Sequence, residues 1–150
     1  MTKQQQFYEH AVPLHREAHA DLWIQPLANY RFAMHSTAMP IVAAEFAHAA
    51  SEYPIVFAGQ GEGLTPVVVL GLGDENNHVD ADGSWKGQYI PAFARRYPFV
   101  FASVEGGERL VLCIDDRYEG LNREGRGEPL FGESDEPTPV MEKALNFLKE

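Results

Sequence analysis

The pattern of apolar positions predicts two similar β-hairpins. Residues 53–58 read Tyr-Pro-Ile-Val-Phe-Ala, and 44 residues later residues 97–102 read Tyr-Pro-Phe-Val-Phe-Ala. Each block is followed by a glycine-bearing turn and then by an apolar run rich in β-branched residues. An apolar strand, a glycine turn and a second apolar strand are typical of a hairpin. We therefore expect hairpins over 53–72 and 97–114, sharing one antiparallel sheet.

Three segments show the features of helices. Residues 40–50 begin with a proline, which suits a first helical position, and continue with many alanines. Residues 91–96 form one or two turns before the second hairpin. Residues 139–148 carry an apolar face that must pack on the domain or on a second copy. The fold class we expect is α+β: an antiparallel sheet from two repeated helix–hairpin units, with flanking short helices.

The segments outside these units are less regular. Residues 115–136 hold half of the net charge together with several glycines and prolines, which predicts a long exposed loop. Residues 22–27 fit an edge strand, because Pro26 has no N–H to donate to a sheet. Asp82-Gly83 predicts a tight turn, flanked by Val79 and Trp85 on paired strands.

Composition narrows the class of protein. A length of 150 residues suits a single domain, 1–150. Twelve basic and 22 acidic residues give a net charge of −10, which disfavours nucleic acid and anionic membranes as partners. The single cysteine, Cys113, excludes an internal disulfide. The longest apolar runs are too short to cross a bilayer, so we expect no membrane insertion. We expect a cytoplasmic protein, with an export signal beyond residue 150 left open.

Four residues are candidates for a binding site. Glu45, His48 and Glu52 share one face of the first helix, where a histidine between carboxylates fits a metal site, a general base or a solvated face. Arg95 and Arg96 are the one adjacent basic pair in an acidic chain. They fit an anion or acidic-partner site, a helix C-terminus, or ion pairs within the chain. The candidate binding residues are therefore Glu45, His48, Arg95 and Arg96.

Other motifs fall short of a site. His15 and His19 have the spacing of zinc ligands on a helix, but the glutamate that zinc proteases place after the first histidine is replaced by Arg16. The Asp80–Asp82 segment resembles a calcium loop with two wrong ligands. We expect no metal and no cofactor.

Several blocks of the sequence, in order along residues 10–150, resemble the SapC family of bacterial proteins. They are Asn29-Tyr-Arg-Phe-Ala33, Pro40-Ile-Val-Ala-Ala-Glu-Phe46, Tyr53-Pro-Ile-Val-Phe57, Val79-Asp-Ala-Asp-Gly-Ser-Trp85, Tyr89-Ile-Pro-Ala-Phe93, Arg95-Arg-Tyr-Pro-Phe99, Leu112-Cys-Ile-Asp115 and Gly127-Glu-Pro-Leu-Phe131. Family members continue beyond the helix at 139–148, so the resemblance implies a truncated member.

The resemblance implies little about activity. The family takes its name from a gene cluster for a bacterial surface layer, and no catalytic residues carry over from it. We expect a non-catalytic accessory or interaction protein linked to surface-layer or envelope biogenesis, with a protein partner or self-association. The alternative is an enzyme or small-ligand binder with a site around Glu45 and His48 or around Arg95 and Arg96.

Overall fold

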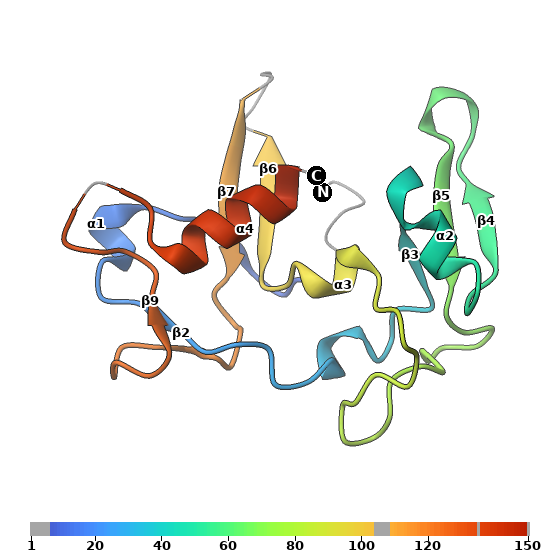
Figure 1. Cartoon of the computed structure of the whole chain (residues 1–150), viewed down its shortest axis with the longest axis horizontal. Helices are drawn as coiled ribbons and strands as arrows, with labels where there is room; N and C mark the ends of the chain where they lie inside the picture. Colours follow the sequence, from blue (N-terminus) through green and yellow to red (C-terminus); the bar gives the residue numbers. More distant parts are fainter. Residues whose placement is uncertain (1–6, 104–108, 135, 150) are drawn as a thin grey trace. The chain divides into compact units, whose positions relative to one another are not determined.

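The structure is a computed structural model that describes residues 7–103, 109–134 and 136–149. The chain forms two compact units (Figure 1). Of the described residues, unit 1 takes Phe7 and 28–95, and unit 2 takes 8–27 and the residues from 96 onward. In sequence, nearly all of unit 1 is therefore inserted between two parts of unit 2.

Unit 1 contains one three-stranded antiparallel sheet in the order β3-β5-β4. Its elements are η1 (Arg31–Ala33), β3 (Ala38–Pro40), η2 (Ala43–Glu45), α2 (Phe46–Ala49), β4 (Ile55–Ala58), η3 (Gly61–Gly63), β5 (Thr65–Val69) and α3 (Ala92–Arg95). Met39 and Val68 are fully buried opposite each other in this sheet. A second apolar group forms where the Phe7 ring packs on the rings of Phe32 and Phe93. Unit 1 thus has a core of its own.

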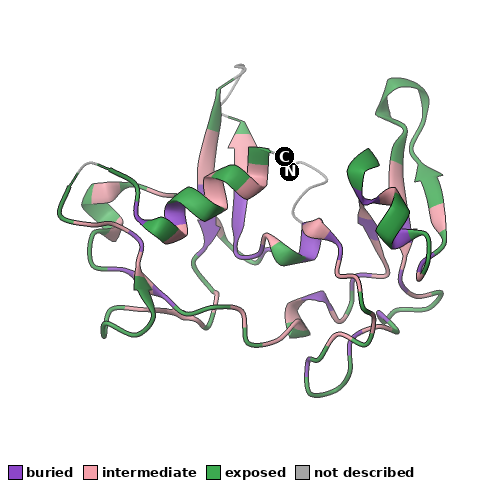
Figure 2. Cartoon of the chain, viewed as in Figure 1, coloured by how far each residue is buried: buried purple, intermediate pink, exposed green. Residues whose placement is uncertain are grey.

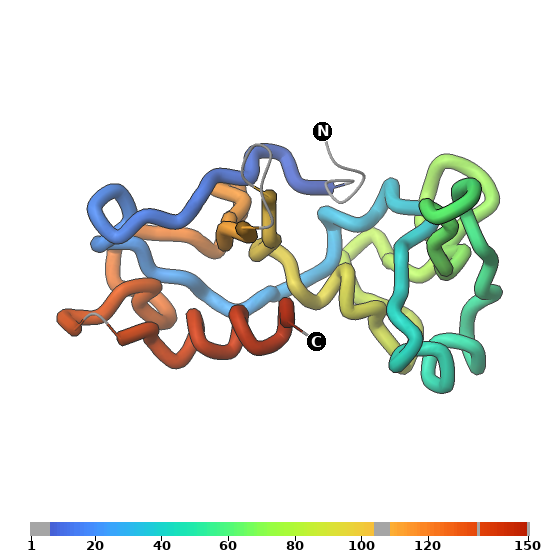
Figure 3. Tube along the Cα trace, turned by 90° about the horizontal axis from the view of Figure 1, so that it is seen from above, coloured from blue at the N-terminus to red at the C-terminus, as the bar shows by residue number. Residues whose placement is uncertain are grey.

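Unit 2 contains two three-stranded antiparallel sheets, β1-β7-β6 and β8-β2-β9. Its elements are β1 (Ala11–Pro13), α1 (Arg16–His19), β2 (Trp23–Ile24), β6 (Phe99–Ser103), β7 (Leu110–Asp115), β8 (Leu121–Asn122), β9 (Glu128–Pro129) and α4 (Pro139–Lys149). Its core contains Leu22, Ile24, Phe99, Ile114, Leu130 and Met141. N-terminal and C-terminal segments run side by side in this unit (Figure 3), because β1 and β2 pair with strands more than 90 residues later.

The paired strands of both predicted hairpins are present, as β4–β5 and β6–β7, and the turn predicted at 105–108 lies outside the described residues. In each sheet the return strand of the hairpin lies in the middle, with an earlier strand on its other side. Equivalent backbone hydrogen bonds join the strands of the two sheets. Within the hairpins, Val69 N–H donates to the Pro54 carbonyl in unit 1 and Asp115 N–H to the Pro98 carbonyl in unit 2, both at 2.9 Å. On the other side of the return strand, Ile41 N–H donates to the Pro66 carbonyl in unit 1 and Leu14 N–H to the Leu112 carbonyl in unit 2, both at 3.0 Å. The two hairpins therefore occupy equivalent positions in their three-stranded sheets.

The expectation that the hairpins share one sheet is wrong. They lie in different three-stranded sheets, one in each unit. The physical reason is that each hairpin completes its sheet with a strand from outside the repeat, β3 in unit 1 and β1 in unit 2. Each hairpin has thereby found a partner strand within its own unit.

The first helix is shorter than predicted. The beginning of the 40–50 segment pairs with β5, because Pro40 lies opposite Val67 and Ile41 donates its N–H to the Pro66 carbonyl. The remainder forms η2 and then the single turn of α2. The other two predicted helices are present as α3 and α4, and α4 places Met141 in the core of unit 2.

Two further expectations need correction. The 115–136 segment is not simply a loop, because it contributes β8 and β9. Both strands pair with β2, so Trp23 and Ile24 lie in a central strand and not at an edge. The turn at Gly83 is confirmed by its φ of +88° and by the bridge between Val79 and Trp85. Among the described residues, no helix is both long and apolar enough to span a bilayer.

Candidate functional site

Three of the four candidate residues converge on one tyrosine that the sequence did not single out. Glu45, His48 and Arg95 all contact Tyr89 in unit 1. The His48 and Tyr89 rings are stacked with their centroids 5.5 Å apart, and the Arg95 guanidinium carbon lies 5.6 Å from the centre of the Tyr89 ring. We call Glu45, His48, Tyr89 and Arg95 the Tyr89 cluster.

Glu45 is the buried member of the cluster, with 6% of its surface exposed. One carboxylate oxygen, Oε1, accepts hydrogen bonds from the Tyr89 hydroxyl at 2.6 Å and from the Ala92 N–H at 2.8 Å. The other oxygen, Oε2, accepts the Val42 N–H at 2.9 Å. The last contact is the usual return of a glutamate side chain to the start of its own helix. Glu45 therefore ties η2, Tyr89 and α3 together.

A second glutamate, Glu52, binds the backbone of the segment that carries Tyr89. The Glu52 carboxylate accepts the N–H groups of Gln88 and Tyr89 at 2.8 and 2.9 Å. The Tyr53 hydroxyl donates to the Tyr89 carbonyl and accepts the Trp85 indole N–H at 2.8 Å. The two glutamates and Tyr53 thus fix the backbone that carries Tyr89.

The chemistry of the cluster follows from these bonds. Burial, and after it the hydrogen bond to Glu45, raises the pKa of the Tyr89 phenol, so the phenol stays protonated and donates. Arg95 uses its Nε–H on the Ile90 carbonyl at 2.8 Å. His48 is exposed on α2. Because both Glu45 oxygens accept bonds from the chain itself, the carboxylate serves as a structural clamp.

Arg96, the fourth candidate, belongs to unit 2. Its guanidinium carbon lies 5.9 Å from the centre of the Tyr8 ring. The Tyr8 hydroxyl donates to the Phe99 carbonyl at 2.7 Å, and burial raises the pKa of Tyr8 to about 12. Arg96 is thus part of the packing of Tyr8 against β6, and the structure does not unite Arg95 and Arg96 in one site.

Asp115 is a buried carboxylate that the sequence reasoning missed. It is fully buried at the end of β7, and it accepts the N–H groups of Glu9, His10 and Arg117 at 2.8 to 3.1 Å. The Tyr97 hydroxyl lies 3.3 Å from it, and burial followed by the charge of Asp115 raises the pKa of Tyr97. No sequence pattern signals this role, because its partners lie in two other segments of the chain.

The remaining histidine and aspartate motifs have local roles. The His15 N–H donates to His19 Nδ1 at 3.0 Å, so that ring nitrogen is used within α1. Asp82 accepts the Ser84 N–H at 2.9 Å, as expected of a turn. Across the described residues, no three His, Cys, Asp or Glu side chains are grouped so that they could hold a metal ion.

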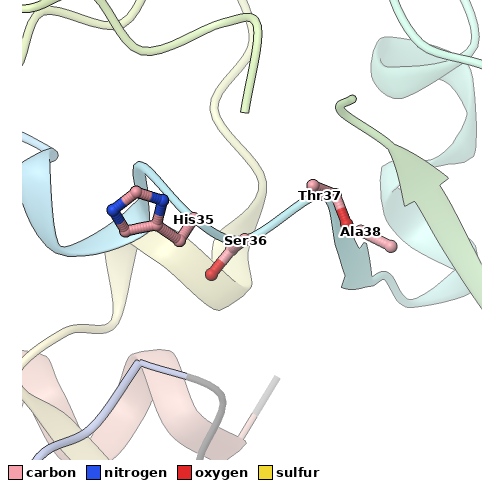
Figure 4. Close-up of a pocket in the computed structure, with 4 residues that line it drawn as sticks. All are labelled: His35, Ser36, Thr37 and Ala38. Carbon is pink, nitrogen blue, oxygen red and sulfur yellow. The ribbon is translucent and has the colours of Figure 1, made fainter. Parts of the chain in front are cut away.

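An open pocket of about 260 Å³ lies along residues 35–38 (Figure 4). It is lined by His35, Ser36, Thr37 and Ala38, which follow one another along the chain. Its volume is slightly below the roughly 300–1,000 Å³ of typical ligand sites. Neither Tyr89 nor another candidate residue lines it.

Much of the β4–β5 hairpin of unit 1 is exposed (Figure 2), and three of its large apolar side chains are among the exposed ones. Val56 is 44% exposed, Phe57 60% and Leu64, in the turn, 52%. The corresponding strand of unit 2 differs, because Phe99 and Val100 in β6 are buried. We call Val56, Phe57 and Leu64 the hairpin patch.

The comparison with family models identifies the chain as a member of the SapC family, with a match over residues 14–150. The match covers nearly the whole chain, including both units. No curated protein and no solved structure matches the chain.

Proposed function

We propose that this SapC protein is a non-catalytic interaction protein, accessory to surface-layer or envelope biogenesis. The hairpin patch is the observation that carries this proposal. Val56 and Phe57 are neighbours in β4, so their exposed side chains lie on opposite faces of the hairpin. A partner that packs along the hairpin would cover apolar side chains on both faces. Full burial of an exposed phenylalanine or valine contributes roughly 1.5–3 kcal/mol, and Val56 and Phe57 are 44% and 60% exposed, so a partner that covers them would gain about half of that for each. The link to the surface layer rests on the family alone.

The polar candidates support the same proposal. Catalysis needs a group that can exchange protons or charge with a substrate. Glu45 accepts three hydrogen bonds from its own chain, and its tyrosine partner is held protonated. These contacts stabilise unit 1 and leave the carboxylate no role toward a substrate.

The second candidate function is a ligand-binding site or enzyme at the Tyr89 cluster. The convergence of His48 and Arg95 on one ring favours it. An exposed histidine and a guanidinium beside a tyrosine suit a small anionic ligand. Replacing His48 and Arg95 by alanine separates the two functions, because only the second depends on them.

We also propose that both units together form one SapC domain. The equivalent strands and hydrogen bonds of the two hairpin sheets arose from duplication of a strand–helix–hairpin segment, with one copy inserted in the other. This reading rests on the repeated Tyr-Pro-x-Val-Phe-Ala blocks and on the equivalent backbone hydrogen bonds of the two sheets.

Site-specific photo-crosslinking in the native cells tests the proposed function. A photoreactive phenylalanine derivative replaces Phe57 in one variant and Leu72 in the control. Leu72 is also apolar, is 96% exposed and lies outside the hairpin. We expect discrete protein adducts from position 57 and none from position 72. Equal labelling at both positions, or no adduct at either, would contradict the proposal, as would loss of the adduct in the His48→Ala/Arg95→Ala variant.

A further inference from the structure

Strand β4 has an unpaired edge. It is an outer strand of its sheet, and the bond from Val69 N–H to the Pro54 carbonyl fixes which groups face β5. Bonded pairs alternate along an antiparallel ladder, so Val56 and Ala58 also face β5. The N–H and carbonyl groups of Ile55 and Phe57 therefore point away from the sheet. Within the described ranges, no residue pairs with them.

At Phe99, the equivalent edge in unit 2 is covered by the chain itself. There the Pro98 carbonyl accepts the Asp115 N–H, so Phe99 holds the position of Ile55. The Phe99 carbonyl accepts the Tyr8 hydroxyl at 2.7 Å, and its N–H donates to the Arg96 carbonyl at 2.9 Å. Proteins usually protect edge strands in such ways or with charges. Unit 1 has neither device on β4.

Charge indicates what can approach this edge. The net charge is −10, so two copies of the chain repel each other over most of their surfaces. The segment 53–73, which contains the whole β4–β5 hairpin, carries a single charge at Glu62. A second copy therefore meets little charge repulsion along β4.

We infer that a second copy of this chain adds its own β4 to this edge, antiparallel and about a twofold axis. The inference rests on the proposed function, because it assigns an occupant to the same hairpin. The result is a continuous six-stranded sheet in which each copy supplies its three strands. Strand addition of this kind is a common mode of recognition between proteins.

The geometry of β4 selects one register. Pairing Ile55 with the second copy's Phe57, and the reverse, uses every outward N–H and carbonyl of the strand. Centring the axis on Phe57 would require pairing through Gly59, whose φ of +104° ends the strand. Centring it on Ile55 would use Tyr53, whose N–H is already bonded to the Ala49 carbonyl. The preferred register places Val56 directly opposite the second copy's Val56.

The pair of facing valines gives the experiment its probe. Residues in such a non-hydrogen-bonded pair have Cα atoms about 4.5 Å apart, which is within the range that a disulfide spans. The proposed contact is a single pair of four-residue strands. Stable complexes bury roughly 800 Å² per partner, so we expect a weak dimer whose population rises with protein concentration.

Oxidative cross-linking of purified Val56→Cys protein tests this dimer. Val42→Cys is the matched control, since Val42 is 52% exposed and lies off the edge. Cys113 is buried and remains in both variants. We expect a disulfide-linked dimer from Val56→Cys only. Equal or absent cross-linking of the two variants overturns the inference.

Sedimentation equilibrium of the unmodified chain and of Val56→Lys gives an independent readout. Two lysines opposite each other repel, so we expect the dimer to be lost in Val56→Lys and retained in Val42→Lys. Circular dichroism checks that each variant is folded. If purified protein stays monomeric while position 57 still yields adducts with another protein in cells, the second copy is the wrong occupant and the proposed function stands. If dimer and adducts are both absent, both proposals fail.

Discussion

Replacing Glu45 tests whether the Tyr89 cluster is a structural clamp. Glu45→Ala removes a buried carboxylate and leaves three donors without an acceptor: the Tyr89 hydroxyl and the N–H groups of Val42 and Ala92. A hydrogen bond to a charged group contributes about 1.5–3 kcal/mol, and bonds in one network are not additive. We therefore expect the free energy of unfolding to fall by roughly 3–5 kcal/mol.

Glu45→Gln gives a graded version of the same change. The amide oxygen can still accept from Tyr89 and Ala92, but the amide nitrogen would face the Val42 N–H, donor against donor. The expected loss is about 1–3 kcal/mol. Glu62→Gln is the control, because Glu62 is exposed in the hairpin turn and its replacement is expected to cost less than about 0.5 kcal/mol.

Urea unfolding followed by tryptophan fluorescence measures these losses. The chain has two tryptophans, and Trp85 donates its indole N–H to Tyr53 beside the cluster. A Trp23→Phe background leaves Trp85 as the reporter for unit 1. If Glu45→Ala loses less than about 1 kcal/mol, or no more than Glu62→Gln, the carboxylate is not a clamp. That result would favour the second candidate function, a ligand-binding site or enzyme at the Tyr89 cluster.

Two further predictions concern stability. Tyr8 has a pKa of about 12 in the folded chain against 10.0 for the free side chain, so its contribution is full below pH 10 and is lost as the pH rises toward 12. Tyr8→Phe should lower the free energy of unfolding by about 1 kcal/mol at pH 8, because the hydrogen bond to Phe99 is lost. Between neutral pH and pH 11, the free energy of unfolding should fall by about 1.4 kcal/mol less in this variant than in the parent. Equal falls in the two proteins, measured by urea titration, would contradict the burial of Tyr8. Gly83→Ala should lower the unfolding free energy by about 1–3 kcal/mol, because φ is +88° and an added methyl would lie 2.7 Å from a side-chain carbon. Gly63→Ala, where the same methyl meets nothing within 4 Å, should change thermal stability far less, and similar losses at both glycines would refute the explanation.

The hairpins could be predicted from the sequence because their signals are local. Apolar runs, glycine turns and the tight turn at Gly83 all lie within a few residues of the structure they specify. The choice of third strand could not be predicted. β3 and β1 are three residues long, too short to show a period, and β1 lies about 100 residues from its partner β7. The strands β8 and β9 could not be predicted either, because two residues are too few to show a period.

The candidate site was predicted in part. Spacing on a helix placed Glu45 and His48 together, and both do contact one residue. Tyr89 was missed because it lies 44 residues from Glu45, and nothing local to Tyr89 distinguishes a buried hydrogen-bonded phenol from any other tyrosine. Arg95 and Arg96 are adjacent in sequence, yet their side chains contact different tyrosines in different units.

Amide hydrogen exchange along β4 tests most directly whether its edge is where another strand binds. Val56 and Ala58 face β5 and serve as internal references, protected at every protein concentration. We expect the Ile55 and Phe57 amides to exchange rapidly in dilute protein and more slowly as the protein concentration rises. Protection of both amides in dilute protein would mean that the chain already covers this edge, and rapid exchange at every concentration would mean that no second copy binds there.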